Sequence, residues 1–354
     1  MTLLPLVLTG VLCATVLAVR FTPRLPRDRT RRHTAPDAAT AAQRSVLLLH
    51  GGYFASPSMA QALGDQGIRT VVRHYSDLVV DVVGGRPCVR EASTGQDVAD
   101  FGLVRTHGPG IPAPLLDTLT GYLAARGRAL RGDAGGGEGH GRAAGAAPVA
   151  PSRPCQGVAL ADAGEPVPDL RFIADRRPDT SFAALAARLG TPFVIRPQFG
   201  GQGGELTHLV RTEGEFEQLT ESPCGPVRYL AQRYVPNNGT FLLLVLGARV
   251  PVVVHRCSTG ASGITNRRHA SHATLFEAGE FDAEVRAMAV RCAALLGYDV
   301  AAVTVVQHRE TREWFVLGVD GDPALADLPF ADETTRAYAH HLSRRLRRRR
   351  SLVK

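Results

Sequence analysis

The segment at residues 191–210, TPFVIRPQFGGQGGELTHLV, constrains the fold of this chain more than any other part. A strand of buried type leads to a basic residue, Arg196, and a glycine-rich turn then precedes a second short apolar run. Glycine lets the backbone turn sharply and come close to a ligand, so that its N–H groups can surround phosphate oxygens. An arginine just before the loop would supply the matching positive charge. The segment therefore indicates either a phosphate-binding loop or a plain glycine-rich hairpin that joins two strands.

Further motifs follow this segment in a fixed order. They are VRYLAQRYVPNNGTFLLLVLGARVPVVVHR, GITNRRHASHATLF, AVRCAALLGYDVAAVTVV and EWFVLGVDGDPAL. In this order and spacing they resemble the ATP-grasp superfamily, and within it the branch of ribosomal-protein glutamate ligases and glutathione-synthetase-like enzymes. The resemblance covers residues 153–323, about half of the chain. It implies an α/β fold of the α+β grasp type, in which a small N-terminal parallel-sheet domain precedes an ATP-grasp domain of two α+β subdomains.

Composition and apolar periodicity divide the chain into six segments. They are a candidate membrane anchor at 1–19, a linker at 20–43, an N-terminal α/β domain at 44–130, a Gly/Ala/Pro-rich disordered linker at 131–154, the ATP-grasp domain at 155–343 and a basic tail at 344–354. The second linker lacks the apolar periodicity of a helix or a strand, which predicts a flexible connection between the two domains.

The N-terminal domain is predicted to contain a small parallel sheet. Residues 44–52 and 68–75 have the pattern of strands, and residues 57–67 between them have helical apolar spacing. A hairpin with a Gly-Gly turn, one more strand and an amphipathic helix at residues 115–130 are expected to follow. The resemblance implies that such a domain helps to form the acceptor side of the cleft.

The N-terminal apolar run at residues 2–19 is near the lower length limit for spanning a bilayer. Arginines crowd its C-terminal side, so the positive-inside rule places the body of the protein in the cytoplasm, where ATP is present. The expected location is therefore cytoplasmic, with anchoring to the inner face of the membrane by this run. A misplaced start codon or a buried N-terminal helix would explain the same residues.

The formal charge is +8, and Lys354 is the single lysine, so phosphate binding has to rely on arginine. The six cysteines include no C-x-x-C pair, which indicates neither a zinc site nor a disulfide framework. No aromatic residues interleave with the arginines of the C-terminus, as a base-stacking surface would need. Nucleic acid is therefore not an expected partner.

The resemblance implies a set of ATP-binding residues. They are Arg153, Arg196, the cover-loop glycines Gly200, Gly201, Gly203 and Gly204, and the purine-slot residues Gln232, Tyr234 and Val235. Arg196 and Arg153 fall at or near the positions of two family lysines, and arginine can bind phosphate through two nitrogens. A linker charge would explain Arg153 as well, and a buried strand without a ligand would explain the pattern around Gln232.

The substrate side of the implied site is only partly present. Arg256 ends a later strand and matches a substrate-side arginine of the family, which makes it the candidate catalytic residue. The family pattern Gly-x-Asp-x-Arg reads NGTFL at residues 238–242, so that Thr240 and Leu242 replace the acid and the arginine.

The metal-binding positions depart furthest from the family. The patterns Gly-Val-Asp and Glu-Val-Asn-x-x-Pro read AVT and GVDGDP here, so that Thr304 and Gly318 replace two carboxylates that would bridge magnesium. The candidate metal ligands that remain are Asp320, Asp322 and Asn266. Magnesium held by one carboxylate together with waters and phosphates is chemically feasible, whereas a full two-metal arrangement is not expected.

Two functions follow from these residues. The first is an ATP-dependent carboxylate–amine ligase that acts through an acyl phosphate on a small amino acid or peptide acceptor. The second is a catalytically degenerate ATP-grasp protein that binds nucleotide or a peptide. A hydrolase is disfavoured, because LLLHGG is not accompanied by a G-x-S-x-G elbow. A Walker-type NTPase is disfavoured by the missing G-x-x-x-x-G-K-[ST] motif.

Overall fold

The structure is a computed structural model. It describes residues 45–50, 57–107, 112–126, 130–131, 152–173, 180–197, 207–220, 229–257, 264, 272–321, 323, 325 and 330–352, all within one compact unit, Asp37–Lys354. The candidate anchor and the first linker lie outside these residues. Within the described ranges, no helix combines the length and the apolar character that crossing a membrane requires.

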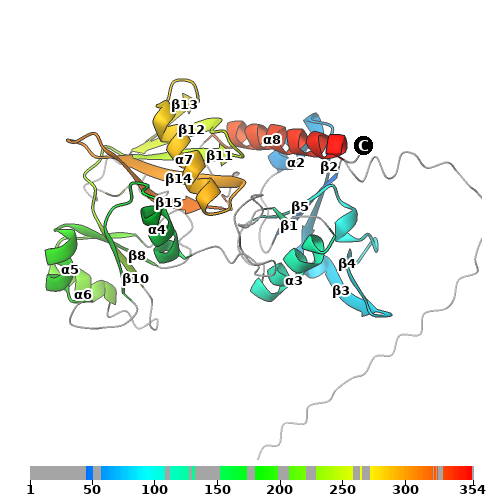
Figure 1. The fold of residues 1–354 in the computed structure, drawn as a ribbon, viewed down its shortest axis with the longest axis horizontal. Coiled ribbons are helices and arrows are strands. Elements are labelled where there is room, and N and C mark those ends of the chain that lie inside the picture. The colour runs from blue at the N-terminus through cyan, green and yellow to red at the C-terminus, as the bar shows by residue number, and fades with distance from the viewer. Residues whose placement is uncertain are drawn as a thin grey trace, which may run out of the picture. The chain divides into compact units, whose positions relative to one another are not determined.

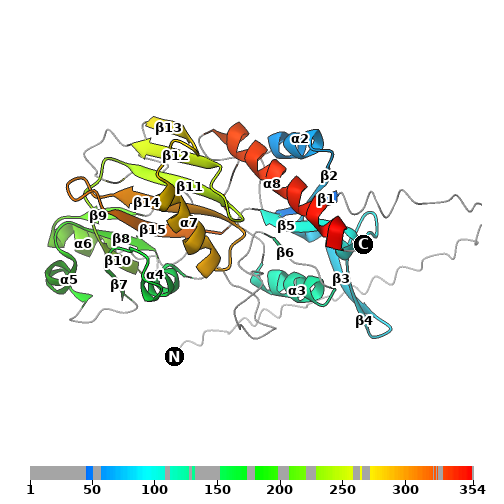
Figure 2. The same ribbon diagram turned by 45° about the horizontal axis from the view of Figure 1, so that its top comes forward.

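The first sheet is parallel, with the strand order β2-β1-β5-β6. Figure 1 labels β1, β2 and β5, and Figure 2 also labels β6. Its elements are β1 (Ser45–His50), α2 (Pro57–Asp65), β2 (Arg69–His74), β5 (Leu103–His107), α3 (Ala113–Ala124) and β6 (Leu130–Arg131). The central strand β1 is buried on both faces, as parallel strands usually are. Leu47 and Leu49 pack in one cluster with residues of α3, whereas Val46 and Leu48 pack in another with residues of α2. The predicted strand–helix–strand order is confirmed.

A hairpin follows β2, as the sequence predicts. It consists of β3 (Leu78–Val83) and β4 (Arg86–Glu91). Gly84 and Gly85 form the turn with φ angles of 60° and 75°, in the left-handed region that tight hairpins need and glycine tolerates. The expected helix at 115–130 is wrong at its C-terminal end. Helix α3 ends at Ala124, ahead of the helix-disfavouring Gly127. Leu130 belongs to β6 and pairs with Val104 of β5.

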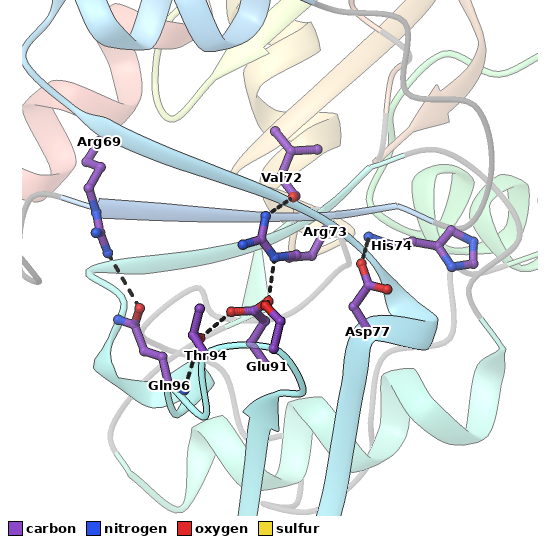
Figure 3. Close-up of polar contacts among 9 residues, drawn as sticks. Arg69, Val72, Arg73, His74, Asp77, Glu91, Thr94 and Gln96 are labelled. Carbon is purple, nitrogen blue, oxygen red and sulfur yellow. Dashed lines mark hydrogen bonds and ion pairs between the residues drawn. The ribbon is translucent and has the colours of Figure 1, made fainter.

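A polar network at Glu91 ties the hairpin to β2 (Figure 3). Arg73 of β2 donates from Nε to the Glu91 carboxylate at 2.8 Å, and the hydroxyl groups of Ser93 and Thr94 donate to the same carboxylate. These hydrogen bonds, led by that of Ser93, lower the pKa of Glu91 from 4.5 to about 2. Glu91 is 3% exposed, so a charged group is held inside the fold by its donors.

The second sheet is antiparallel, with the strand order β7-β10-β8-β9. Its elements are β7 (Leu170–Ile173), α5 (Phe182–Leu189), β8 (Phe193–Pro197), β9 (His208–Val210), α6 (Glu213–Thr220) and β10 (Tyr229–Arg233). Helices α5 and α6 cover one face (Figure 2), where Phe193, Ile195 and Ala231 pack against them. Because side chains alternate along a strand, Arg196 and Gln232 lie on the opposite face.

The third sheet is also antiparallel, with the strand order β13-β12-β11-β14-β15. Its elements are β11 (Thr240–Leu246), β12 (Val252–Cys257), β13 (His272–Glu277), α7 (Ala283–Leu295), β14 (Val300–Gln307), β15 (Trp314–Asp320) and α8 (Ala331–Leu352). Leu243 and Val303 pack with α7 on one face, and Leu244 and Val254 pack with α8 on the other. The pairing of β14 with β15 shifts register after Thr304, which is a β-bulge.

Two helices extend into segments that composition assigned to a linker and a tail. Helix α4 (Arg153–Asp162) begins with Ser152 as its N-cap and with Pro154 in its first turn, which are both favoured there. Arg153 is therefore a helical residue and not a linker charge. Helix α8 continues to Leu352, beyond the expected end of the domain at 343, because Leu342 and Leu346 continue its buried stripe.

Candidate functional site

A cavity lies between the second and third sheets, where α4 packs on both. Its lining includes Arg153, Gln156, Leu170, Arg196, Gln232 and Gly318. The empty space is about 270 Å³ when the solvent at its open mouth is included. The described residues thus bring together three of the residues expected to bind ATP, and these come from α4, β8 and β10.

Arg196 joins the two sheets at this cavity. Its Nη2 donates to the carbonyl oxygen of Leu317 in β15 at 2.5 Å. The residue as a whole is partly buried, but its Nε is inaccessible to solvent and has no hydrogen-bond partner among the described groups. Burial, with a further contribution from the charge of Arg153, lowers the pKa of Arg196 to about 9. At neutral pH the guanidinium remains charged, and Arg196 lines the cavity with this charge.

Gln232 lies beside Arg196 on the same face of the second sheet. It pairs with Leu170 of β7 on one side and with Val194 of β8 on the other, and it is 4% exposed. A buried amide side chain needs hydrogen-bond partners, and a bound ligand could provide them. The predicted purine-slot residues Tyr234 and Val235 follow β10 directly, and Val235 is buried, but neither is in the described cavity lining.

Helix α4 packs closely between β7 and β15. Gln156 accepts a hydrogen bond at Oε1 from the backbone N–H of Val319 at 3.2 Å. A Cβ atom at Gly157 would lie 2.3 Å from Cδ2 of Leu170, so a larger residue there would force the leucine side chain to shift. Sequence reasoning missed Gln156 and Gly157 as site residues. The Ser-x-Pro cap at 152–154 is the signal that could have found the helix that carries them.

Arg153, the first residue of α4, lies against β15. A Cβ atom built at Gly318 would be 3.3 Å from its Nη1. Burial lowers the pKa of Arg153, and the charge of Asp320 opposes that effect. The charge of Arg153 in turn acts on Arg196. Among the residues that the structure describes, the site therefore brings two cations and the acid Asp320 close together.

The positions where the sequence departs from the ATP-grasp patterns that it resembles form one row across the third sheet. Leu242 of β11 pairs with Thr304 of β14, and Thr304 pairs with Gly318 of β15. Paired residues of adjacent strands share a face, so the register brings together the positions at which the family has arginine, aspartate and glutamate. Asp320, two residues after Gly318, lies on the same face.

This row does not fit a magnesium ion held by carboxylates. Threonine offers one neutral oxygen and glycine offers none, which leaves Asp320 as the acid on this face of β15. Over the residues that the structure describes, no group of three His, Cys, Asp or Glu side chains could hold a metal ion. The other two candidate ligands, Asp322 and Asn266, lie outside the described residues.

The remaining predicted residues have other placements. Arg256 of β12 pairs with Thr240 of β11, on the same face as Leu242, but it is not in the described lining of the cavity. Gly239, next to Thr240, has a φ of 134°, and a Cβ there would lie 2.4 Å from the carbonyl oxygen of Arg256. The cover-loop glycines at 200, 201, 203 and 204 lie outside the described residues.

Comparison with known sequences gives a partial match. No protein-family model matches the chain. A D-alanine–D-alanine ligase from Laribacter hongkongensis (strain HLHK9) is 35% identical over 92 residues, which are 26% of this chain and 29% of that enzyme. The matched part is less than a third of the length of that relative.

Comparison with solved structures gives matches over most of the chain. The ATP-grasp ligase PsnB, complexed with a minimal precursor, Mg and ADP, has a TM-score of 0.59 at 14% identity and covers 84% of this chain and 98% of its own. A RimK domain protein from Sphaerobacter thermophilus DSM 20745 has a TM-score of 0.56 at 19% identity, with coverage of 84% and 98%. The macrocyclase MdnC from Microcystis aeruginosa MRC, bound with precursor peptide MdnA, has a TM-score of 0.56 at 13% identity, again with 84% and 98%.

Proposed function

We propose, from the premise that this chain has the ATP-grasp fold, that it is an ATP-dependent carboxylate–amine ligase. The observation that carries the proposal is the cavity between the two antiparallel sheets, lined by Arg153, Arg196 and Gln232. Two guanidinium groups suit the phosphates of a nucleotide, and the buried amide of Gln232 suits a polar, planar base. The match to D-alanine–D-alanine ligase over 92 residues supports the same class of reaction.

The proposed reaction has two steps. A carboxylate oxygen of the donor attacks the γ-phosphorus of ATP, ADP leaves, and an acyl phosphate forms. An amine then attacks the acyl carbon, inorganic phosphate leaves, and the ammonium proton is lost. Catalysis of phosphoryl transfer is mostly positioning and charge stabilisation. In this chain Arg196, fixed by its bond to Leu317, and Arg153 would supply that charge.

The proposed acceptor is a small amino acid or a peptide. PsnB and MdnC are bound with precursor peptides in their solved structures, which supports a peptide. We further propose that Arg256, on the same sheet face as Gly318, contacts the donor or the acceptor beyond the phosphates. The site and its substrates rest on the geometry of the described residues and on the shared fold.

A titration with ATP and a search for product test this function. The full chain, incubated with ATP and pools of amino acids and short peptides, is expected to release ADP in proportion to a product that mass spectrometry identifies as a condensed species. ATP binding without ADP release in any pool would contradict the ligase assignment. No ATP binding at all would contradict the proposed site.

A second candidate function is supported by the row at Leu242, Thr304 and Gly318. These residues replace the arginine and carboxylates that the family would use there. A protein with this row could bind a nucleotide, or a peptide, without ligating. Binding of ATP with no turnover in the pool experiment is the result expected for this alternative.

A further inference from the structure

We propose that Arg153 replaces the magnesium ion at the phosphate site, so that this chain binds ATP without a divalent metal. The inference rests on the proposed function, since it concerns the same cavity. It assigns the positive charge beside the phosphates to a side chain of this protein. In the PsnB structure, by comparison, ADP is accompanied by Mg.

The first step of the argument is what the third sheet lacks. Thr304 and Gly318 stand side by side on β14 and β15, where the family pattern places the two bridging carboxylates. A hard divalent cation needs oxygen ligands, preferably charged ones. A single carboxylate, that of Asp320, is described on this face of β15. The described side chains of the sheet therefore give a divalent ion little to bind.

The second step is what occupies the freed space. The Nη1 atom of Arg153 is 3.3 Å from where a Cβ atom at Gly318 would be. Even a methyl group there would be a tight contact, and the side chain of glutamate would have to meet the guanidinium. Because Gly318 has no side chain, the guanidinium of Arg153 can lie where the family pattern has an acid. A cation therefore lies beside the position of the missing carboxylate.

The third step concerns charge. Arg153 and Arg196 are close enough for the charge of one to act on the other, and the charge of Asp320 acts on Arg153. Among the described residues, the two cations outnumber the one acid that acts on them, whereas a site lined by carboxylates is negative until it takes up a metal. Like charges in a partly buried site repel each other, and a polyphosphate between them would relieve this repulsion. The site is therefore suited to the free anion.

The measurement is calorimetric titration of the full chain with ATP, once with excess MgCl₂ and once with EDTA. We expect the affinity in EDTA to equal or exceed that in magnesium, because free ATP carries more negative charge than its magnesium complex. Binding that strengthens more than about tenfold with magnesium would overturn the inference while leaving the proposed nucleotide site intact. Absence of binding under both conditions would overturn both.

A pair of variants isolates the contribution of Arg153. Gly318→Glu places a carboxylate against the guanidinium, and Gly318→Gln adds nearly the same volume without a charge. We expect Gly318→Glu to bind ATP in EDTA about tenfold to hundredfold more weakly than Gly318→Gln, since it neutralises a charged phosphate contact. Equal affinities in two folded variants would overturn the inference.

Two further variants guard against loss of the fold or a non-specific charge effect. Arg153→Gln removes the cation without adding volume at position 318, and its ATP affinity in EDTA should fall by a similar factor of about ten or more. Arg188→Gln removes one exposed arginine from α5, outside the cavity lining, and should bind as the unchanged chain does. A similar loss in both variants would overturn the specific role of Arg153.

Discussion

Arg196 donates a hydrogen bond to the main chain of β15 and also lines the cavity with its positive charge. Its Nη2 is committed to the carbonyl oxygen of Leu317, which fixes the plane of the guanidinium. Its Nε is buried and without a partner among the described groups, while the residue lines the cavity. With a pKa of about 9 the group stays charged at neutral pH, although burial disfavours the charge. A bound phosphate would offset that cost.

We therefore expect Arg196→Ala to weaken ATP binding by about tenfold to hundredfold, the range for losing hydrogen bonds to a charged group. Arg196→Lys should retain part of the affinity, since it keeps the charge but not the fork of donors. Calorimetric titration measures both. An alanine variant with unchanged affinity would show that Arg196 does not contact phosphate.

Glu91 illustrates how a residue can fasten one element to another. Its carboxylate receives hydrogen bonds from Arg73 on β2 and from Ser93 and Thr94 just after β4 (Figure 3). The pKa of this carboxyl falls from 4.5 to about 2, so the folded state favours the charged form. The stabilisation is present above the unfolded pKa of 4.5 and is lost as the pH falls through about 2.

The free energy of unfolding should accordingly decrease as the pH falls from 4.5 to about 2, by roughly 3 kcal/mol from this group. Glu91→Gln should be less stable than the unchanged chain at neutral pH, and the difference should shrink toward pH 2. Urea unfolding across this pH range measures the effect. A difference that is constant with pH would contradict the assigned cause.

At the scale of elements, α4 is placed by close packing on the strands beside it. Gly157 lets the helix approach Leu170 of β7, and Gln156 binds the backbone of Val319 in β15. The same helix carries Arg153 into the cavity. The position of Arg153 therefore depends on a glycine one turn further along the helix.

Gly157→Ala should destabilise the chain by up to about 2 kcal/mol, because the overlap of its Cβ with Cδ2 of Leu170 outweighs the gain of about 1 kcal/mol in helix propensity. In a Leu170→Ala background the same change should cost clearly less, since the atom that it meets is gone. Chemical denaturation of the four chains gives this coupling. Additive effects would contradict the proposed contact.

The elements predicted correctly are those whose apolar spacing or turn residues are complete within a short stretch of sequence. Strands β1 and β2 and the hairpin turn at Gly84 and Gly85 are of this kind. Helix α4 was missed because a Gly/Ala/Pro-rich run precedes it and conceals its cap at Ser152.

At the scale of the molecule, one apolar cluster includes residues of the parallel sheet, the third sheet and α8. Leu48 of β1, Leu244 of β11 and Leu342 of α8 belong to it. A buried polar contact lies alongside, in which Arg105 of β5 donates from Nη1 to the hydroxyl of Tyr338 at 2.6 Å. The Arg105 guanidinium also lies 4.3 Å from the centre of the Tyr338 ring.

Tyr338→Phe should lower the free energy of unfolding by about 1–3 kcal/mol, because it removes an acceptor from a buried cation but keeps the ring. Tyr338→Leu should cost more, since the ring is lost as well. Urea unfolding followed by fluorescence of the single tryptophan, Trp314 on β15, measures both variants. Unchanged stability of the phenylalanine variant would contradict this role of the hydroxyl.

The fold could be predicted from the order of motifs, and the ATP-grasp fold is confirmed by the solved neighbours. The charge arrangement of the site could not. The sequence showed that Thr304 and Gly318 lack carboxylates, but their pairing depends on the register of β14 and β15. Arg153 and Gly318 are 165 positions apart in the sequence, and they come close because α4 packs against β15. No local sequence pattern reveals such a contact.

The bulge in β15 has a consequence for how this protein can vary. Thr304 pairs with Gly318 and Val305 with Val316, so Leu317 is the extra residue and its carbonyl is turned to Arg196. The accepting oxygen belongs to the main chain, so mutation of the Leu317 side chain leaves the hydrogen bond to the Arg196 guanidinium in place. Deletion of one residue from β15 would restore the regular pairing with β14 and remove the carbonyl acceptor of Arg196. Substitutions at this point are thus expected to be tolerated across evolution, whereas a change in strand length is not.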